Sequence, residues 1–206
     1  MKINRTKIRT PLFMAASAAL AAITLIAVVT GCGKTETAVA KPSGFTPQQM
    51  ADALFTVMSS DRAVYTKQVV NRLQNEEKVI KASEHWQDDK ALPLPAQMFR
   101  MGAETVSGKN AGFNYSLLSL WPVNKQNAPK TDVEKTGLQY VADAKGASNY
   151  YSDETLGGKK YFTAVYPDVA VSAACVKCHN SHEDSPRSDF KLNDVMGGVV
   201  LRIPME

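Results

Sequence analysis

Five consecutive residues in the last quarter of the chain, Cys175-Val176-Lys177-Cys178-His179, constrain its structure more than any other feature. On a helical turn, two cysteines three residues apart share one side, and here a histidine follows directly. Such a turn can form two thioether bonds to the vinyl groups of one porphyrin while the adjacent imidazole reaches the iron. Cys-x-x-Cys-His is the attachment pattern of c-type haem. The sequence therefore predicts one covalent haem c on Cys175 and Cys178, with His179 as the proximal iron ligand.

Three other interpretations of these cysteines remain open. A redox-active Cys-x-x-Cys pair or a structural disulfide suits an exported protein, but neither uses His179. A βαβ pattern around the motif would favour a redox pair, but the sequence shows none there. A zinc site would draw on Cys175, Cys178, His179 and His182. Four ligands so close in sequence are poorly spaced to surround a tetrahedral ion.

The sixth coordination position of the iron has several candidate ligands. Met98 and Met101 lie one turn apart on an expected short helix, and a thioether opposite histidine raises the reduction potential. Each methionine is equally consistent with core packing. His85 is expected at the end of the long first helix and is also consistent with a solvated surface histidine, and His182 is expected to be exposed. An open or water-filled position is the remaining alternative.

The N-terminus has the composition of an export signal. Residues 1–10 contain four basic side chains and no acidic one, and an apolar, uncharged stretch follows. Small residues then lead to Cys32 in a pattern that resembles the lipobox of bacterial lipoproteins. We expect a signal peptide over residues 1–31 and a lipid on Cys32; ordinary cleavage or a transmembrane anchor are the alternatives. Gly33 in place of Asp favours sorting to the outer membrane, so the domain is expected on the periplasmic side.

Removal of the signal leaves a domain with balanced charge. Four of the 24 Lys and Arg residues lie in the signal, which leaves 20 against 20 Asp and Glu. A balanced domain does not favour nucleic-acid binding, which needs a clustered basic face. Residues 32–45 are small and polar and are expected to form a flexible tether. Residues 46–206 are long enough for one domain with its own core.

The order of helix and strand patterns indicates an α+β domain. A capping box at Thr46 opens a long N-terminal helix that runs to about His85, either unbroken or broken near residues 59–61. A second capping box, at Thr131, opens a later helix. The remaining expected elements are an extended connector over 91–95, a short helix over 96–106, strands over 113–120, 150–154, 160–165 and 195–203, and a helix over 131–144. Helices come first and strands follow, which favours a mostly antiparallel sheet.

The loop after the first expected strand resembles a known signature. Residues 119–129, with the sequence Ser-Leu-Trp-Pro-Val-Asn-Lys-Gln-Asn-Ala-Pro, and then Glu134 resemble the Asn-Pro-x-Asn-x-Pro…Glu signature of a bacterial domain family of unassigned function. The haem motif, followed by Gly197-Gly198 before a last strand, matches the order in that family. Trp121 and Pro122 depart from the usual residues, so the resemblance does not give the contacts of this loop. It implies a PAS-like fold, one c-type haem near the C-terminus and a variable distal ligand.

The resemblance also implies a role. Members of the family are usually regarded as haem-based sensors of redox state or small gas ligands, alone or ahead of signalling modules. We recognise no output module here, so we expect a separate redox or signalling partner protein. A periplasmic electron-transfer cytochrome is the alternative. No readable motif pairs a distal base with an arginine, so enzyme activity is not expected. The long first helix is consistent with a homodimer or with packing on its own domain.

Overall fold

The computed structural model describes residues 44–205 of the chain. The expected signal peptide, the expected lipidation site Cys32 and nearly all of the expected tether lie outside the described residues. Within the part that is described, no helix combines the length and the apolar composition needed to cross a bilayer.

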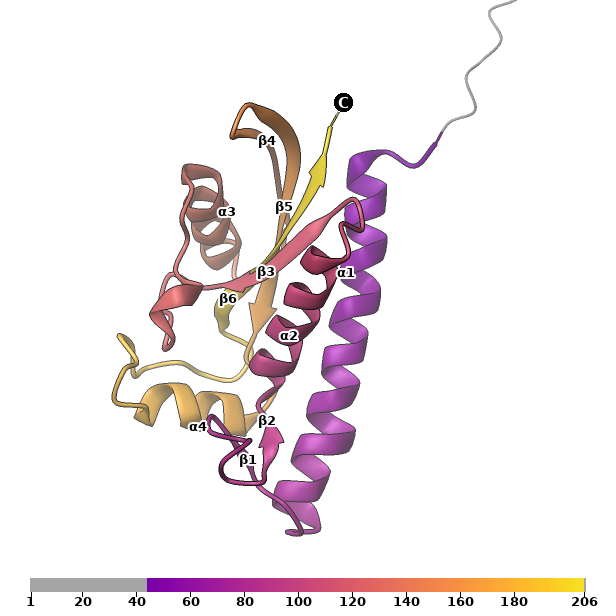
Figure 1. Ribbon diagram of the computed structural model, residues 1–206. Coiled ribbons are helices and arrows are strands. Elements are labelled where there is room, and N and C mark those ends of the chain that lie inside the picture. The colour runs from indigo at the N-terminus through magenta and orange to yellow at the C-terminus, as the bar shows by residue number, and fades with distance from the viewer. Residues whose placement is uncertain (1–43, 206) are drawn as a thin grey trace, which may run out of the picture. The chain divides into compact units, whose positions relative to one another are not determined.

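A four-stranded antiparallel sheet with the strand order β3-β6-β5-β4 lies at the centre of the domain (Figure 1). Its strands are β3 (Asn114–Leu118), β4 (Tyr150–Leu156), β5 (Lys159–Val169) and β6 (Val195–Pro204). Strands β4 and β5 form the hairpin expected around Gly157 and Gly158. Both glycines have positive φ angles, 56° and 79°, in the left-handed region that favours glycine. With its helices, the sheet confirms the expected α+β class.

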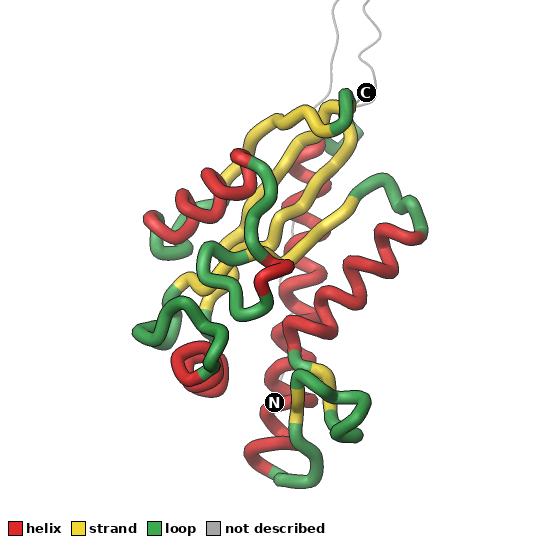
Figure 2. The backbone as a smooth tube through the Cα atoms, turned by 60° about the vertical axis from the view of Figure 1, so that its left-hand side comes forward, coloured by secondary structure: helices red, strands yellow, loops and turns green. Residues whose placement is uncertain are grey.

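Helices cover both faces of this sheet. Helices α1 (Pro47–Val64) and α2 (Pro95–Gly108) lie on one face, and α3 (Asp132–Asp143) lies on the other (Figure 2). Successive side chains of a strand point to opposite faces, so a strand covered on both sides needs apolar residues without alternation. This explains Val199-Val200-Leu201 in β6, where all three residues are buried: Val200 packs beneath α3, and its two neighbours pack beneath α1 and α2.

Two glycines in β6 allow neighbouring elements to come close. A Cβ atom at Gly197 would lie 2.4 Å from the carbonyl oxygen of Leu118 in β3. A Cβ atom at Gly198 would lie 2.8 Å from the side chain of Leu138 in α3. Neither space admits a larger residue without movement of its neighbour. Gly197-Gly198 is therefore explained by the packing of β3 and α3 against the strand.

The first helix begins as expected but ends earlier. Thr46 Oγ1 accepts a hydrogen bond from the backbone N–H of Gln49 at 3.1 Å, and Gln49 reaches back to Thr46, which confirms the capping box. Helix α1 continues without a break near residues 59–61 into η1 (Tyr65–Glu76), which has π-helical hydrogen bonds. Acidic residues at the C-terminal end of η1 oppose the helix dipole, and Lys78 adopts a left-handed φ of 56°.

The end of η1 corrects the expectation for His85. The chain leaves the helix and forms β1 (Ala82–Ser83), which pairs in parallel with β2 (Leu92–Pro93). His85 lies in the turn between these short strands and is exposed, rather than at the end of a long helix. The extended connector over residues 91–95 is confirmed by β2, and α2 follows it as expected.

Glu134, Arg202 and Glu154 form a buried ion network that joins α3 to the sheet. Arg202 Nη2 lies 2.7 Å from Glu134 Oε1, and Arg202 Nε lies 2.6 Å from Glu154 Oε1. The side chains of Glu134, Arg202 and Glu154 are 5 %, 11 % and 4 % exposed, respectively. Glu134 also accepts a hydrogen bond from the backbone N–H of Thr131 at 3.0 Å, which confirms the second capping box. Loss of the arginine would leave two buried carboxylates without a counter-charge.

We expect Arg202→Met to lower the free energy of unfolding by about 3–5 kcal/mol, because removal of one partner leaves buried charge uncompensated. Urea denaturation measures this loss. The matched control is Arg100→Met, since Arg100 forms an exposed pair with Glu104 one turn away. Such a pair contributes at most about 1 kcal/mol. Equal losses in the two variants would contradict a structural role for the network.

The stability of the domain should also depend on the charge of Glu154. Burial raises the pKa of Glu154, but hydrogen bonds from Thr163 and Arg202 and the charge of Arg202 outweigh it, so the pKa lies below the ordinary value of a glutamate. A carboxyl with a lowered folded-state pKa contributes stability above its unfolded-state pKa and loses it as the pH falls through the folded-state value. The difference in unfolding free energy between wild type and Glu154→Gln should therefore narrow as the pH falls below the unfolded-state pKa of a glutamate, about 4.3. If the difference in unfolding free energy between the two proteins stayed constant as the pH fell, the charge of Glu154 would make no contribution to stability.

Candidate functional site

The cysteine motif lies on a short helix between two central strands. Helix α4 (Ala173–Ser181) follows β5, and Ser172 caps its first turn by accepting a hydrogen bond from the backbone N–H of Cys175. Cys175, Cys178 and His179 share one side of this helix because they are three and four residues apart. The structure therefore brings together the three residues that the sequence assigned to haem attachment.

Both cysteines of the motif are free thiols. Cys175 is half-buried and Cys178 is exposed. Partial burial of its thiol raises the pKa of Cys178, and the charges of Glu84 and Cys175 act in the same direction. Cys178 is therefore a neutral thiol near neutral pH.

His179 is half-buried, and its ring meets Phe190 edge-on, with ring centroids 6.0 Å apart and planes at 89°. Its Nδ1 atom is buried and has no hydrogen-bond partner in the described part of the chain. Burial lowers the pKa of His179; the charge of Asp168 opposes this effect, and those of His182 and Arg62 add to it. The imidazole is therefore neutral at physiological pH, which is the form that binds metal ions.

A small apolar cluster packs behind α4. Phe190, Ala170 and Met196 are its buried members, and Trp121, Cys175 and Val176 pack against it. Arg187 stacks over two of the rings, 4.8 Å from the centroid of Trp121 and 4.3 Å from that of Phe190. Trp121, which departs from the expected signature, thus packs against the cluster behind α4.

Asn180 fixes α4 to the loop that follows it. Its side-chain amide donates to the backbone oxygen of Phe190 at 2.9 Å, and its side-chain oxygen accepts from the backbone N–H of Phe190 at 3.0 Å. These two bonds hold Phe190 beneath the ring of His179. The orientation of the His179 imidazole therefore depends on Asn180, its neighbour in sequence, and on Phe190, which lies in the loop after α4.

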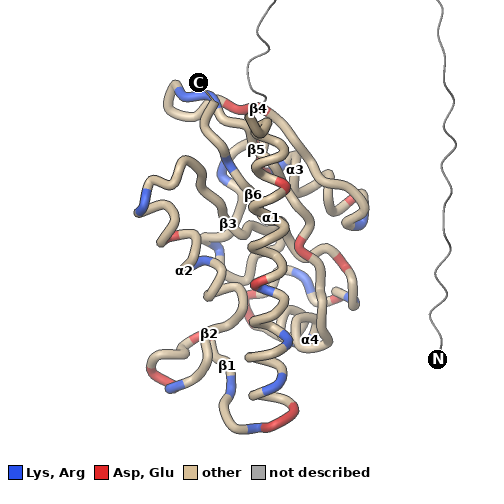
Figure 3. The backbone as a smooth tube through the Cα atoms, turned by 90° about the vertical axis from the view of Figure 1, so that its right-hand side faces the viewer, with Lys and Arg blue, Asp and Glu red and all other residues tan. Residues whose placement is uncertain are grey.

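Two ion pairs lie around α4. Arg62 of α1 pairs with Asp168 of β5 through both terminal nitrogens of the guanidinium. His182 Nε2 lies 3.0 Å from Glu84 Oε1 in the turn between β1 and β2. The side chain of His182 is only 20 % exposed because of this pair, so the expectation of an exposed histidine is wrong. Along the described backbone as a whole, basic and acidic positions are interspersed (Figure 3).

The geometry does not assemble a zinc site. Both ring nitrogens of His182 are engaged, one by Glu84 and the other by the backbone N–H of Asp184 at 3.1 Å. Within residues 44–205, no three or more His, Cys, Asp or Glu side chains gather as they would around a metal ion.

The candidate distal ligands lie apart from the motif in sequence. Met98 and Met101 lie on α2 as expected and are half-buried, while His85 is exposed. A cavity of about 480 Å³ lies between η1 and α4, and none of these three residues lines it. Its lining residues are Gln74, Asn75, Ala173, Ala174, Lys177, Cys178 and Ser181. The structure therefore does not select one distal ligand from the three.

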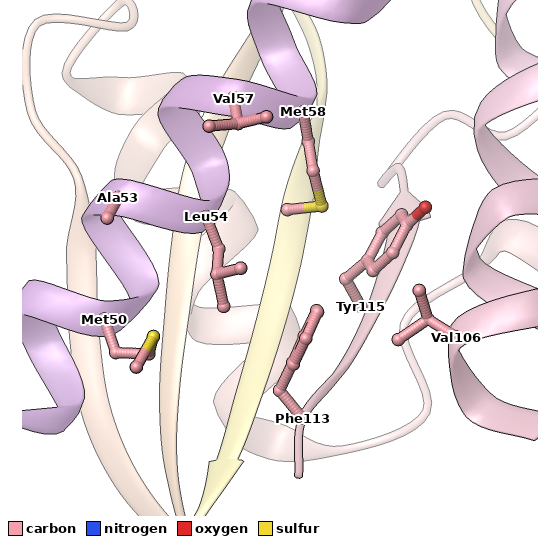
Figure 4. Close-up of a pocket in the computed structure, with 8 residues that line it drawn as sticks. All are labelled: Met50, Ala53, Leu54, Val57, Met58, Val106, Phe113 and Tyr115. Atoms are coloured by element: carbon pink, nitrogen blue, oxygen red, sulfur yellow. The ribbon is translucent and has the colours of Figure 1, made fainter. Parts of the chain in front are cut away.

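A second cavity, of about 290 Å³, is apolar and lies between α1, α2 and β3 (Figure 4). Its lining residues are Met50, Ala53, Leu54, Val57, Met58, Val106, Phe113 and Tyr115. The hydroxyl of Tyr115 is the only polar side-chain group among them. Besides the hydroxyl of Tyr115, the lining side chains offer only the weakly coordinating sulfurs of Met50 and Met58.

The loop signature has a structural role in this chain. The side-chain oxygen of Asn124 accepts a hydrogen bond from the backbone N–H of Gln126 and caps η2 (Lys125–Asn127). The backbone oxygen of Asn127 accepts from the N–H of Ser119 at 2.9 Å. Glu134 caps α3 and pairs with Arg202, as described above. The residues of this signature therefore hold a loop and a helix in place.

Sequence analysis did not identify Arg62, Asp168 or Phe190 as parts of the site. Arg62 lies far from the motif in sequence, and no motif includes it. One signal was present: Arg62 follows Met58 by one helical turn on the side of α1 that packs on the sheet, an unusual position for a charge. Phe190 lies in a polar loop with no periodic pattern.

Comparisons with known proteins agree with this fold. No curated protein matches the chain. The crystal structure of the cyanobacterial heme-protein Tll0287 superimposes with a TM-score of 0.51 at 12 % identity, over 79 % of this chain and 98 % of that chain. At this identity the likeness shows the fold alone, and the PAS-like topology stays a prediction. The model of the Tll0287-like family matches residues 45–204, most of the sequence. The chain therefore belongs to the Tll0287-like family.

Proposed function

We propose that this chain is a haem c protein in which Cys175 and Cys178 hold one haem as thioethers and His179 is the proximal iron ligand. One observation carries the proposal. Both free thiols and the imidazole share one side of α4, and Nδ1 of the imidazole is buried without a partner among residues 44–205. The motif itself is specific for c-type haem.

The residues around α4 fit such a group. Neither Cys175 nor Cys178 forms a disulfide within the described residues, and Cys178 is exposed to solvent. The neutral imidazole of His179 is the form that an iron ion requires. When bound, the haem would supply an iron that exchanges one electron and accepts an axial ligand.

The chain's own residues hold and orient these groups. Phe190 limits rotation of the His179 ring through their edge-on contact, and Asn180 fixes Phe190 through two backbone hydrogen bonds. The apolar cluster with Trp121 and Met196 excludes water from the far side of α4. Such support fixes the orientation and basicity of a metal-binding histidine.

The role that we propose for the haem is sensing of redox state or of a small gas ligand. Two observations support it. The structural relative is described as a heme-protein, and none of Met98, Met101 and His85 lines the cavity beside Cys178. A position that is open, or that holds an easily displaced ligand such as a methionine thioether, would permit exchange of an external ligand. The sensor would act through a separate redox or signalling partner protein.

The proposal includes the location of the domain. The basic and apolar N-terminus and the residues before Cys32 support export and a lipid anchor, which would hold the domain at the periplasmic side of the outer membrane. Electron transfer is the second candidate function. It is favoured by the exposure of Cys178, because a haem attached there would present an edge to a redox partner.

We expect the protein, produced with c-haem maturation, to give an alkaline pyridine haemochrome spectrum of the two-thioether type. Cys175→Ala or Cys178→Ala should shift the spectrum to the one-thioether type, because one vinyl group stays intact. The double variant should lose covalent haem. His182→Ala is the matched control, since His182 adjoins the motif but pairs with Glu84, and it should keep the wild-type spectrum. A colourless wild-type protein containing zinc would contradict the proposal.

The distal position can be tested with carbon monoxide. We expect reduced wild-type protein to bind carbon monoxide rapidly, because a sensor needs an open or easily displaced axial position. We expect Met98→Ala or Met101→Ala to change the spectrum without carbon monoxide, because each would remove a candidate thioether ligand. Wild-type spectra in both variants would exclude methionine and make His85→Ala the next variant. Failure of carbon monoxide to bind would favour the electron carrier.

A further inference from the structure

Arg62 and Asp168 form an ion pair close to the helix that bears the proposed haem ligands. Both terminal nitrogens of Arg62 reach the carboxylate, with Nη2 3.2 Å from Oδ2. The two side chains are 22 % and 20 % exposed, so the pair is largely withdrawn from solvent. The guanidinium also lies 5.7 Å from the ring centroid of Phe99 in α2. Contacts from β5 and α2 therefore fix the head group of an arginine that belongs to α1.

One donor of this arginine is unused. The Nε atom is buried and has no acceptor among residues 44–205. The guanidinium stays protonated, so Nε always carries a hydrogen, and a buried N–H without an acceptor disfavours the folded state. Buried donors nearly always have partners in folded proteins. A fixed, unsatisfied donor at this place therefore indicates an acceptor that a bound group supplies.

The pair lies next to the proposed haem site. Asp168 is two residues before Ala170, which is fully buried in the cluster that contacts Cys175. Helix α4 begins at Ala173, five residues after Asp168, so the ion pair lies close to the start of the helix that carries Cys175.

We propose that Arg62, held by Asp168, is a positioning residue that donates its Nε–H to an oxygen acceptor carried by the bound haem. This inference rests on the proposed function. Arg62 cannot ligate iron, because a guanidinium has no acceptor lone pair, so it contributes a hydrogen bond and a positive charge. The acceptor is a haem propionate or an oxygen atom of an external ligand. Both are oxygen acceptors, the propionate with a full negative charge and the external ligand with a partial one.

The test compares haem-loaded wild type with Arg62→Met, Arg62→Lys and Asp168→Asn. At a fixed ambient potential, Arg62→Met should raise the ratio of ferric to ferrous protein about tenfold, the effect of one partly buried charge. Asp168→Asn should shift the ratio in the opposite direction. Arg62→Lys keeps the charge but loses the Nε–H, so it should recover the ratio only in part. Arg72→Met is the matched control, because Arg72 lies on η1 in an exposed pair with Glu77, and it should leave the ratio unchanged.

Infrared spectra of the ferrous carbonyl complexes separate the two acceptors. A higher C–O stretching frequency in Arg62→Met would assign the donor to an external ligand, and an unchanged frequency with a shifted ratio would assign it to a propionate. The inference would be overturned if the ratio of ferric to ferrous protein in Arg62→Met and Asp168→Asn stayed within about twofold of wild type while both variants kept a normal haem content. Full recovery by Arg62→Lys would also overturn it.

Haem content separates this inference from the proposed function. Wild-type protein without covalent haem would overturn the proposed function, and the inference with it. If Arg62→Met does not fold, Arg62→Lys and Asp168→Asn carry the comparison, because each keeps most of the volume of the native side chain.

Discussion

The position of α4 depends on two backbone hydrogen bonds that close the segment between β5 and β6. The N–H of Ala170 donates to the oxygen of Asp194 at 2.9 Å, and the N–H of Asn193 donates to the oxygen of Ala170 at 3.0 Å. Helix α4 and the loop after it leave the sheet at the end of β5 and rejoin it at the start of β6, where these two bonds lie. Asn180 then joins the helix to the loop. The placement of two thiols and an imidazole follows from this closure, since α4 itself is short.

The rest of the domain supports that closure from both faces of the sheet. Strands β5 and β6 are neighbours, and they are buried beneath α1 and α2 on one face and α3 on the other. The network around Arg202 holds α3 against the sheet. In this chain, Asn124 and Glu134 of the loop signature serve packing, whereas the cysteine motif lies on a separate short helix, α4.

Much of the fold was predictable from local patterns. The capping boxes at Thr46 and Thr131, the hairpin at Gly157-Gly158 and the last strand each depend on residues that are neighbours in sequence. The end of the first helix was not predictable in the same way. Apolar residues continue at near-helical spacing to Ile80. The helix nevertheless ends before Ile80, because η1 has an acidic end and Lys78 adopts a left-handed conformation.

The site was predictable only in part, for a related reason. Cys175, Cys178 and His179 are local, and their spacing alone indicates haem attachment. Arg62 and Phe190 act through contacts between segments far apart in sequence, and no local pattern predicts such contacts. The turn that holds His85 and Glu84 is a similar case, because its pairing with His182 depends on where η1 ends.

Mass spectrometry of the mature protein shows whether haem is attached covalently to α4. The protein is produced in a host that installs c-type haem and is then digested. We expect the peptide containing Cys175 and Cys178 to carry the added mass of one haem. The same peptide at its unmodified mass, from a host shown to mature another c-type cytochrome, would rule out covalent attachment.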